Sequence, residues 1–285
     1  MKEPKLVHLF LAIVFLGAMG CAGILGGRVE YEMVEEKAIN EASGIAASLK
    51  TPGLLYTHND SGGEAALYVL NKIGLMPARI ILSGVRNRDW EDIAVARDPN
   101  GGTPHIYIGD IGDNQAQYSS CTIYRFPEPA ITDTLLTLTQ IESIEFAYED
   151  GPRDSEAMFV DPRTGDIFII SKREEHSGIY RIPYPQSTTL LNLAERIGSL
   201  PYNWVTAADI SPSGKYILVK TYSAINRYAR GPGESIGEAL RGKCKSLKYL
   251  LEEQGEAVAW DCRGNGYFTI SERLGATPVN LYYYP

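Results

Sequence analysis

Acidic residues recur along this chain at a nearly constant spacing and in similar local sequence. Residues 154–162 align with residues 254–262, so that a Glu, an Ala and an Asp coincide, and three further segments continue the series. The residues at the shared position are Glu41, Glu91, Glu156, Thr206 and Glu256. A fixed period of this kind predicts repeated structural units whose equivalent residues lie on one side of the molecule. Carboxylates gathered in this way cannot all stay ionised without a counter-charge, so we expect a bound cation.

The residue types at these positions indicate which cation would bind. All of them offer oxygen ligands, and no His or Cys recurs beside them. Oxygen ligands suit calcium or magnesium better than zinc, and flexible carboxylates in a wide ring favour calcium, with magnesium as the alternative. A different interpretation stays open, in which each Glu caps its own unit by accepting backbone N–H bonds.

Basic residues follow several of the expected strands. Lys172, Arg173, Lys220 and Arg273 lie in segments expected at the same end of the molecule as the acidic positions. Together they predict a site for an anionic small molecule that carries phosphate or carboxylate groups. The alternative is that each is a solvated loop charge.

His58 and Asp60 form a further candidate pair in one of these segments. A His beside an Asp can act as a general base that activates water, whereas a lone His in a turn commonly only accepts or donates hydrogen bonds. The motifs of serine hydrolases, phosphate-binding loops and zinc proteases are absent from the sequence. Catalysis therefore depends on this pair and the expected cation.

Each acidic position begins a similar series of strand signals. A short apolar run is followed by a Gly or Pro turn, a run of β-branched and aromatic residues, a polar loop and a third run. Fourth strands are predicted at residues 80–82, 141–146 and 247–250, and the signal is weakest near residues 196–198. Four strands in about 50 residues are typical of a β-propeller blade.

These units predict an all-β, five-bladed β-propeller. The last unit ends after its third strand, and residues 28–34 alternate as a strand should, so we expect this N-terminal strand to close the last blade. A six-bladed ring is the alternative, in which the longer second unit hides extra strands. Because the first strand of a blade lines the central tunnel, the acidic positions are expected to form a ring at one mouth of that tunnel.

This pattern resembles a known group of proteins. A Glu at the head of most innermost strands, including Glu156 and Glu256, with Thr206 in the fourth, is similar to the calcium-activated nucleotidases of the apyrase type. The wider likeness is to exported phytase-like propeller proteins. The resemblance implies that the five recurring positions hold one calcium ion that positions a nucleotide phosphate.

The first residues have the order of an export signal. Lys2 and Lys5 precede an apolar stretch at residues 6–16, and small residues lead to Cys21. We expect a signal at 1–20 and a tether at 21–28, with lipidation of Cys21 holding a single propeller domain of residues 29–285 at the membrane of the cell envelope. An uncleaved membrane anchor is the alternative, because apolar residues continue to Leu25.

The other cysteines allow one bridge at most if Cys21 carries lipid. Cys121 is expected at the acidic mouth, whereas Cys244 and Cys262 are expected at the opposite side. The hypothesis is therefore a Cys244–Cys262 disulfide in an oxidising compartment.

The net charge of −8 argues against nucleic acid as the main partner. We expect a monomer that binds a ligand or partner in the cell envelope. The alternative function is calcium-dependent hydrolysis of a phosphoester or nucleotide. The missing catalytic motifs favour binding.

Overall fold

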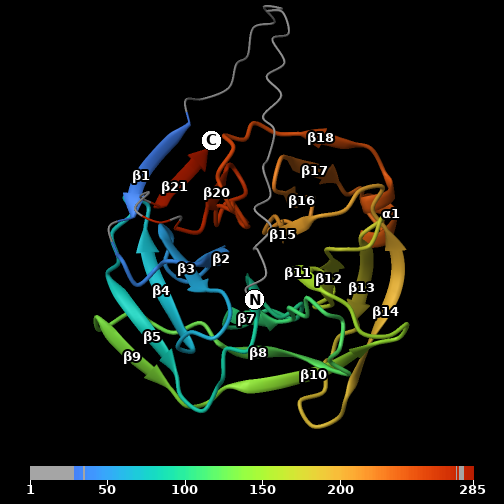
Figure 1. Cartoon of the computed structure of the whole chain (residues 1–285), viewed down its shortest axis with the longest axis horizontal. Coiled ribbons are helices and arrows are strands. Elements are labelled where there is room, and N and C mark those ends of the chain that lie inside the picture. The colour runs from blue at the N-terminus through green and yellow to red at the C-terminus, as the bar shows by residue number, and fades with distance from the viewer. Residues whose placement is uncertain (1–28, 35, 274, 276–278) are drawn as a thin grey trace, which may run out of the picture.

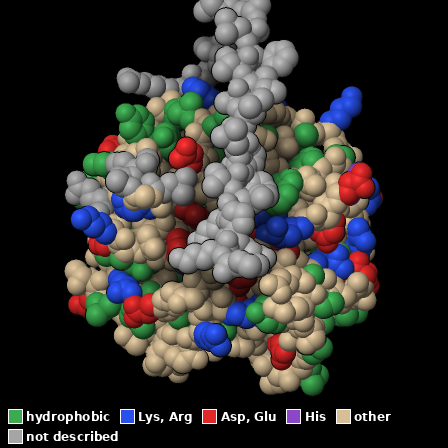
Figure 2. All heavy atoms as spheres, viewed as in Figure 1, with side chains coloured by type: hydrophobic (Ala, Val, Ile, Leu, Met, Phe, Trp, Pro, Cys, Tyr) green, Lys and Arg blue, Asp and Glu red, His purple; other side chains and the backbone are tan. Residues whose placement is uncertain are grey.

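The computed structural model describes residues 29–285 except 35, 274 and 276–278, so the expected signal, tether and lipidated Cys21 lie outside the described residues. The described chain is all-β apart from one short helix. Its sheets surround a common axis, with β1, β5, β10, β14 and β18 towards the rim (Figure 1). Acidic and basic side chains are interspersed over the face in view (Figure 2). Within the described residues, no helix has the length and apolar character needed to cross a membrane.

The first sheet has the strand order β2-β3-β4-β5-β9. Its strands are β2 (Ala42–Ala47), β3 (Leu54–Asn59), β4 (Ala66–Asn71), β5 (Ala78–Leu82) and β9 (Leu135–Leu138). The first four run antiparallel in sequence order, while β9 adds to the outer edge in parallel with β5.

The second sheet has eight strands in the order β11-β12-β13-β14-β10-β8-β7-β6. Its first half in sequence is β6 (Trp90–Ala96), β7 (His105–Asp110), β8 (Cys121–Pro127) and β10 (Glu142–Tyr148). Its second half is β11 (Ser155–Val160), β12 (Ile167–Ser171), β13 (Gly178–Ile182) and β14 (Asn192–Ser199). Each half is antiparallel, and the two outer strands β10 and β14 join them in parallel.

The remaining strands form two sheets of four. One contains β15 (Val205–Ile210), β16 (Tyr216–Thr221), β17 (Ile225–Ala229) and β18 (Cys244–Ser246), with helix α1 (Ile236–Arg241) between its last two strands. The other has the order β1-β21-β20-β19 and contains β1 (Glu30–Val34), β19 (Ala257–Trp260), β20 (Tyr267–Ile270) and β21 (Val279–Tyr284).

The inner strands contact one another in a closed circuit. β2 contacts β6, β6 contacts β11, β11 contacts β15, β15 contacts β19, and β19 returns to β2. An apolar cluster fills each space between successive inner strands and the strands beside them. Because both faces of each sheet are covered, strands such as β12 are buried along their whole length instead of alternating. The core is therefore a ring of inter-sheet layers around the axis.

The pairing of the N-terminal strand with the last sheet is confirmed. β1 lies antiparallel to β21, from Glu30 opposite Tyr283 to Val34 opposite Val279. The extra residues of the longer second unit form β9, which extends the edge of the preceding sheet. The region near residue 196, where the sequence signal for a strand was weakest, forms β14, one of the longer strands. β10 and β13 pair with its backbone on either side, which supports this length. The strand predicted at residues 247–250 is instead β18, which ends at Ser246.

The disulfide hypothesis is wrong. Cys244 and Cys262 are both free, as is the buried Cys121. Cys244 lies in the outer strand β18, whereas Cys262 follows the innermost strand β19. β18 and β19 belong to different sheets, and two strands about 5 Å apart separate β18 from the innermost strand of its own sheet, so Cys244 at the rim is beyond the reach of a bridge to Cys262 near the axis.

Deletion of residues 29–38 is expected to lower the free energy of unfolding by roughly 3–5 kcal/mol. It removes β1, uncovers the edge of β21 and takes buried Val34 out of the core. Denaturant unfolding of the full chain and the deletion variant measures the effect. Tyr31→Ala, at an exposed position of the same strand, is the control and should change stability little. Equal stability of the deletion variant and the parent would show that β1 does not close the sheet.

Candidate metal centre

β-Bulges place the recurring acidic residues. The strand register skips one residue between Trp90 and Asp92, between Ser155 and Ala157, and between Val205 and Ala207. The skipped residues are Glu91, Glu156 and Thr206. A bulged residue leaves the regular alternation of the strand and can be aimed differently from its neighbours. All three side chains are buried, as is Glu256 at the start of β19.

The first unit differs from its predicted alignment. In β2 the bulge lies between Ala42 and Gly44, so Ser43 occupies the position that Glu91 and Glu156 hold in their strands. The Ser43 hydroxyl is buried and donates to the Trp90 carbonyl at 2.8 Å. Glu41 lies two residues earlier and is exposed at the mouth. The predicted ring is therefore incomplete at Glu41, because the sequence alignment was offset by two residues.

Two groups of three carboxylates converge and share Glu91. Asp60, Asp89 and Glu91 form one group, and Glu91, Asp154 and Glu156 form the other. In each group the ligand oxygens lie within 4.8 Å of one another. With Glu256 and Glu272, these residues are called the acidic cluster below. Carboxylate oxygens at this separation are an arrangement that hard divalent cations prefer.

Buried ligand atoms remain free in the acidic cluster. Oε2 of Glu156 and the hydroxyl of Thr206 have no hydrogen-bond partner among the described residues. Only 5% of the surface of Glu156 and 1% of that of Thr206 is exposed, so solvent water has little access to hydrogen-bond these atoms. Gly112 lies against the first group, and a Cβ there would collide with the carboxylates of Glu91 and Asp89. The backbone thus leaves space where these carboxylates meet.

The pKa values in the cluster reflect burial among like charges. Burial first, and then the neighbouring Glu156, raises the pKa of Glu91 well above its usual value. Burial and Glu256 raise the pKa of Glu156 to about 8, although Lys172 opposes the shift. Burial and Glu256 likewise raise the pKa of Glu272 to about 8, and burial and Asp89 raise that of Asp60 to about 6. A cation bound here would replace protons.

Lys172 is the buried positive charge of the cluster. Its Nζ bonds to Glu156, donates to the Tyr222 hydroxyl at 3.0 Å and lies 3.8 Å from Oε1 of Glu256. The Tyr222 hydroxyl in turn donates to Glu256 at 2.5 Å. This network compensates Glu156 and Glu256 and leaves Glu91, Asp89 and Asp60 without a basic partner within 4.0 Å among the described residues.

Lys220 and His58 do not reach the cluster. Both are the second-last residue of their strand, β16 and β3, whereas Lys172 follows the end of β12. Lys220 bonds to the Gly255 carbonyl and lies 4.7 Å from the Tyr249 ring, and Nδ1 of His58 lies 3.1 Å from the Asn59 carbonyl. Each lies two residues before the counterpart of Lys172 in its unit, so it lies roughly 6–7 Å further along the strand from the mouth.

His58 and Asp60 therefore form no contact. His58 is buried against Trp90, and desolvation lowers its pKa to about 4. Asp60 lies in the acidic cluster instead. The structure does not bring the two together as a general base pair.

The two arginines predicted to bind an anion are both engaged. Arg273 donates to the carbonyls of Val34 and Glu36 at 3.3 Å each, and so holds the segment between β1 and β2. Arg173 pairs with Asp154 and lies 5.6 Å from the Trp204 ring at the rim of the cluster. Of the four predicted cations, Lys172 and Arg173 lie at the cluster, and each is already paired with a carboxylate.

Sequence reasoning missed several members of the cluster. Asp89 and Asp154 lie two residues before the bulged Glu of their strands, and Glu41 is their counterpart in the first unit. Tyr222 and Glu272 occupy the position of Lys172 in their units. The sequence does show an acidic residue two positions before Glu91 and before Glu156. This pattern could have identified Asp89 and Asp154 as members of the cluster.

Comparisons with known proteins identify no family. No protein-family model matches the sequence, and no curated protein is significantly similar to it. A chain in the crystal structure of a nidogen/laminin complex shares 14% identity, over 82% of this chain and 73% of that one, with a TM-score of 0.47. Chains this dissimilar need share neither ligand nor partner. None of these comparisons supports the resemblance to calcium-activated nucleotidases or phytase-like propellers.

Proposed function

We propose that the chain is a five-bladed β-propeller whose acidic cluster binds a divalent cation at one mouth of the central axis. The closed circuit of β2, β6, β11, β15 and β19 supports five blades. The five apolar clusters between successive units support the same count, and β1 completes the last blade. β9 and the pairing of β10 with β14 are then additions at the rim.

The cation proposal rests on one observation above all. Glu91, Asp154 and Glu156 are buried, converge within 4.8 Å and leave Oε2 of Glu156 unpartnered. Burying like charges together is costly unless they are protonated or neutralised by a cation. The all-oxygen donor set favours calcium, with magnesium as the alternative. Glu91 belongs to both carboxylate groups and is the central ligand.

The positions of the basic residues favour binding over phosphoester hydrolysis. Lys220 and Arg273 face backbone carbonyls, and Lys172 and Arg173 are paired with Glu156 and Asp154. A phosphate would find few free donors at this mouth. The bound cation would instead hold together the loops that carry Asp60, Asp89 and Asp154.

We also propose the setting of this function. The order of residues 1–21 supports export and attachment to a membrane of the cell envelope. The cation-stabilised loops would then present a surface to an envelope ligand or partner. Calcium-binding modules outside the cytoplasm commonly have dissociation constants of roughly 0.1–1 mM. A weak calcium site would therefore suit this setting.

Glu91→Gln is expected to lower calcium affinity roughly 100-fold, because it removes the charge shared by both carboxylate groups. Isothermal titration of the chelator-treated full chain with calcium, and separately with magnesium, measures this. Glu64→Gln is the matched control, since Glu64 is an exposed residue that pairs with Arg79. The calcium affinity of the Glu64→Gln variant should match that of the parent.

Two further variants locate the ion. Asp60→Asn weakens binding if the group with Asp89 holds the cation, and Asp154→Asn does so if the group with Glu156 holds it. A parent protein that binds neither metal at millimolar concentration would contradict the proposal. So would a Glu91→Gln variant that binds calcium as tightly as the parent.

A further inference from the structure

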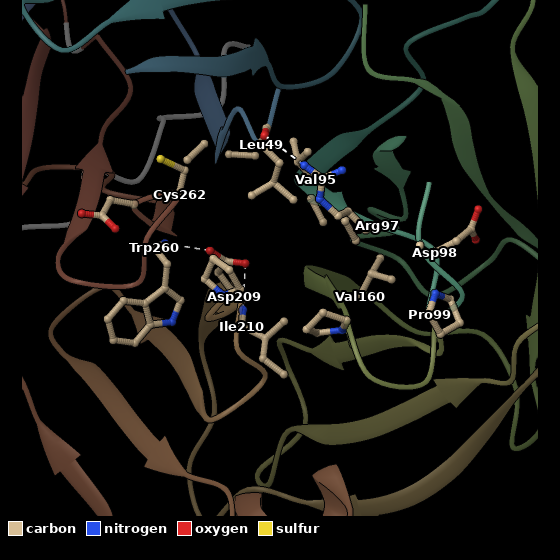
Figure 3. Close-up of a pocket in the computed structure, with 18 residues that line it drawn as sticks. Leu49, Val95, Arg97, Asp98, Pro99, Val160, Asp209, Ile210, Trp260 and Cys262 are labelled. Carbon is tan, nitrogen blue, oxygen red and sulfur yellow. Dashed lines mark hydrogen bonds between the residues drawn. The ribbon is translucent and has the colours of Figure 1, made fainter. Parts of the chain in front are cut away.

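A cavity of about 400 Å³ lies at the opposite ends of the inner strands from the acidic cluster. Its wall contains the last residues of β2, β6, β11, β15 and β19 and the turns that follow them. Figure 3 shows Val95, Val160, Ile210 and Trp260 around it, with Asp209 among them. Most of the lining residues are apolar, although backbone and charged groups also expose polar atoms to the cavity, and the volume suits a small organic molecule.

A buried carboxylate separates this cavity from the acidic cluster. Asp92 follows Glu91 and is completely buried. One of its oxygens accepts from the backbone N–H groups of Met158 at 2.8 Å and Ala208 at 3.2 Å. These bonds join β6 to β11 and β15 across the axis. The cavity is thus a second site, independent of the proposed cation.

Asp209 gives the cavity its charge. Oδ2 accepts the backbone N–H of Trp260 at 2.7 Å, and Oδ1 accepts that of Ile210 at 2.7 Å (Figure 3). These bonds fix the carboxylate, which stays half-buried because it faces the cavity. Among the described residues, no basic side chain lies within 4.0 Å of it. Its desolvation raises the pKa of Asp209 to about 7.

The other charged residues of the lining do not compensate Asp209. Arg97 is exposed at the rim and donates to the carbonyls of Gly102 at 2.9 Å and Leu49 at 3.3 Å. Asp98 and Asp261 add further negative charge. Asp261 accepts backbone N–H groups and the Tyr283 hydroxyl, so it is satisfied. The cavity therefore combines an apolar wall with a net negative charge.

We propose that this cavity binds a small organic cation, with its ammonium group against the Asp209 carboxylate and its apolar body against Val95 and Ile210. Among the described residues the carboxylate has no basic partner of its own, and it supplies the counter-charge for the ammonium group. An inorganic metal ion fits less well, because both oxygens of Asp209 already accept backbone N–H groups and Asp261 is likewise satisfied. An anion is repelled by Asp98, Asp209 and Asp261.

The test compares two probes of the same size and shape. 2-Phenylethylammonium carries a charge and 2-phenylethanol does not, so titration of the full chain at about pH 8, where Asp209 is ionised, isolates the ammonium group. Binding is followed by calorimetry and by the tryptophan fluorescence. The parent should bind the ammonium probe roughly 10-fold or more tightly than the alcohol.

Asp209→Asn should lower the affinity for the ammonium probe about 10- to 100-fold and change the affinity for the alcohol little. Val95→Phe fills the cavity and keeps the Asp209 charge, so it should lower the affinity for both probes. This second variant tests the site even if Asp209→Asn does not fold. Glu64→Gln, at an exposed residue outside the cavity and the acidic cluster, is the control that should bind both probes like the parent. Calcium added to the parent should leave its affinity for the ammonium probe unchanged, which separates this site from the cation proposal.

Three results would overturn the proposal. The first is no binding of the ammonium probe to the parent at millimolar concentration. The second is equal affinity for the two probes, which would indicate a site for neutral apolar molecules. The third is an unchanged ammonium affinity in folded Asp209→Asn or Val95→Phe protein.

Discussion

Lys172→Met is expected to destabilise the cation-free protein by roughly 3–5 kcal/mol at about pH 9, where Glu156 is ionised in the parent, because it leaves buried carboxylates without their positive partner. Calcium should restore most of this loss, since a bound cation supplies the charge that Lys172 provided. The same substitution is expected to raise calcium affinity about 10-fold, because it removes a competing cation. A residue needed only for packing would show neither calcium effect.

The measurement is denaturant unfolding of the parent and the variant, each with a chelator and with millimolar calcium. Lys215→Met is the control, because Lys215 is exposed and outside the acidic cluster. Equal destabilisation of Lys172→Met in the two conditions would contradict the role of calcium as a replacement charge. An unchanged stability without calcium would show that the pairing of Lys172 with Glu156 contributes nothing.

The cation-free protein is expected to lose roughly 2–3 kcal/mol of stability between about pH 6.5 and 8. Glu156 and Glu272 each have a pKa raised from 4.5 to about 8 in the folded protein. A carboxyl with a raised pKa contributes stability that is complete below about pH 4.5 and is lost as the pH rises through about 8. His58 acts in the opposite direction, but only between about 4 and 6.5.

Unfolding curves collected at several pH values with a chelator test this prediction. Calcium should flatten the pH dependence, because the cation replaces the protons of the two carboxyl groups. Glu156→Gln should remove about half of the slope without calcium. Asp209 and Glu252, each with a pKa of about 7, titrate in the same range and leave a residual slope that calcium does not remove. A stability that rises across this interval would contradict the raised pKa values.

The repeat in the sequence was sufficient to predict the strands and the part of the site that depends on strand position. Turn residues and apolar runs recur with the unit, so most strands and the pairing of β1 with β21 could be predicted. Glu91, Glu156 and Glu256 lie within one residue of the start of inner strands and were found because similar positions recur along the chain. Local patterning determines such features, since a strand exposes its residues with a fixed period.

Other members of the site depend on register, which the tertiary structure decides. The bulge in β2 places Ser43 in the ring and makes Glu41 the counterpart of Asp89, an alignment that the shared Ile-Ala pair supports but that only the strand register establishes. His58 and Lys220 lie two residues before Asp60 and Tyr222, the positions that reach the cluster, so they lie further along their strands from the mouth. The pairing of distant strands sets which position reaches the cluster.

The second cavity could not be predicted from the sequence either. Asp209 aligns with ordinary strand residues of the other units, and its charge matters only because no basic side chain approaches it in the folded chain. The partner of a buried carboxylate depends on which strands meet across the axis. Sequence alone therefore determined which residues form strands and which strand begins with a carboxylate. The tertiary structure decided which carboxylates converge, because residues far apart in the chain meet only when the ring closes.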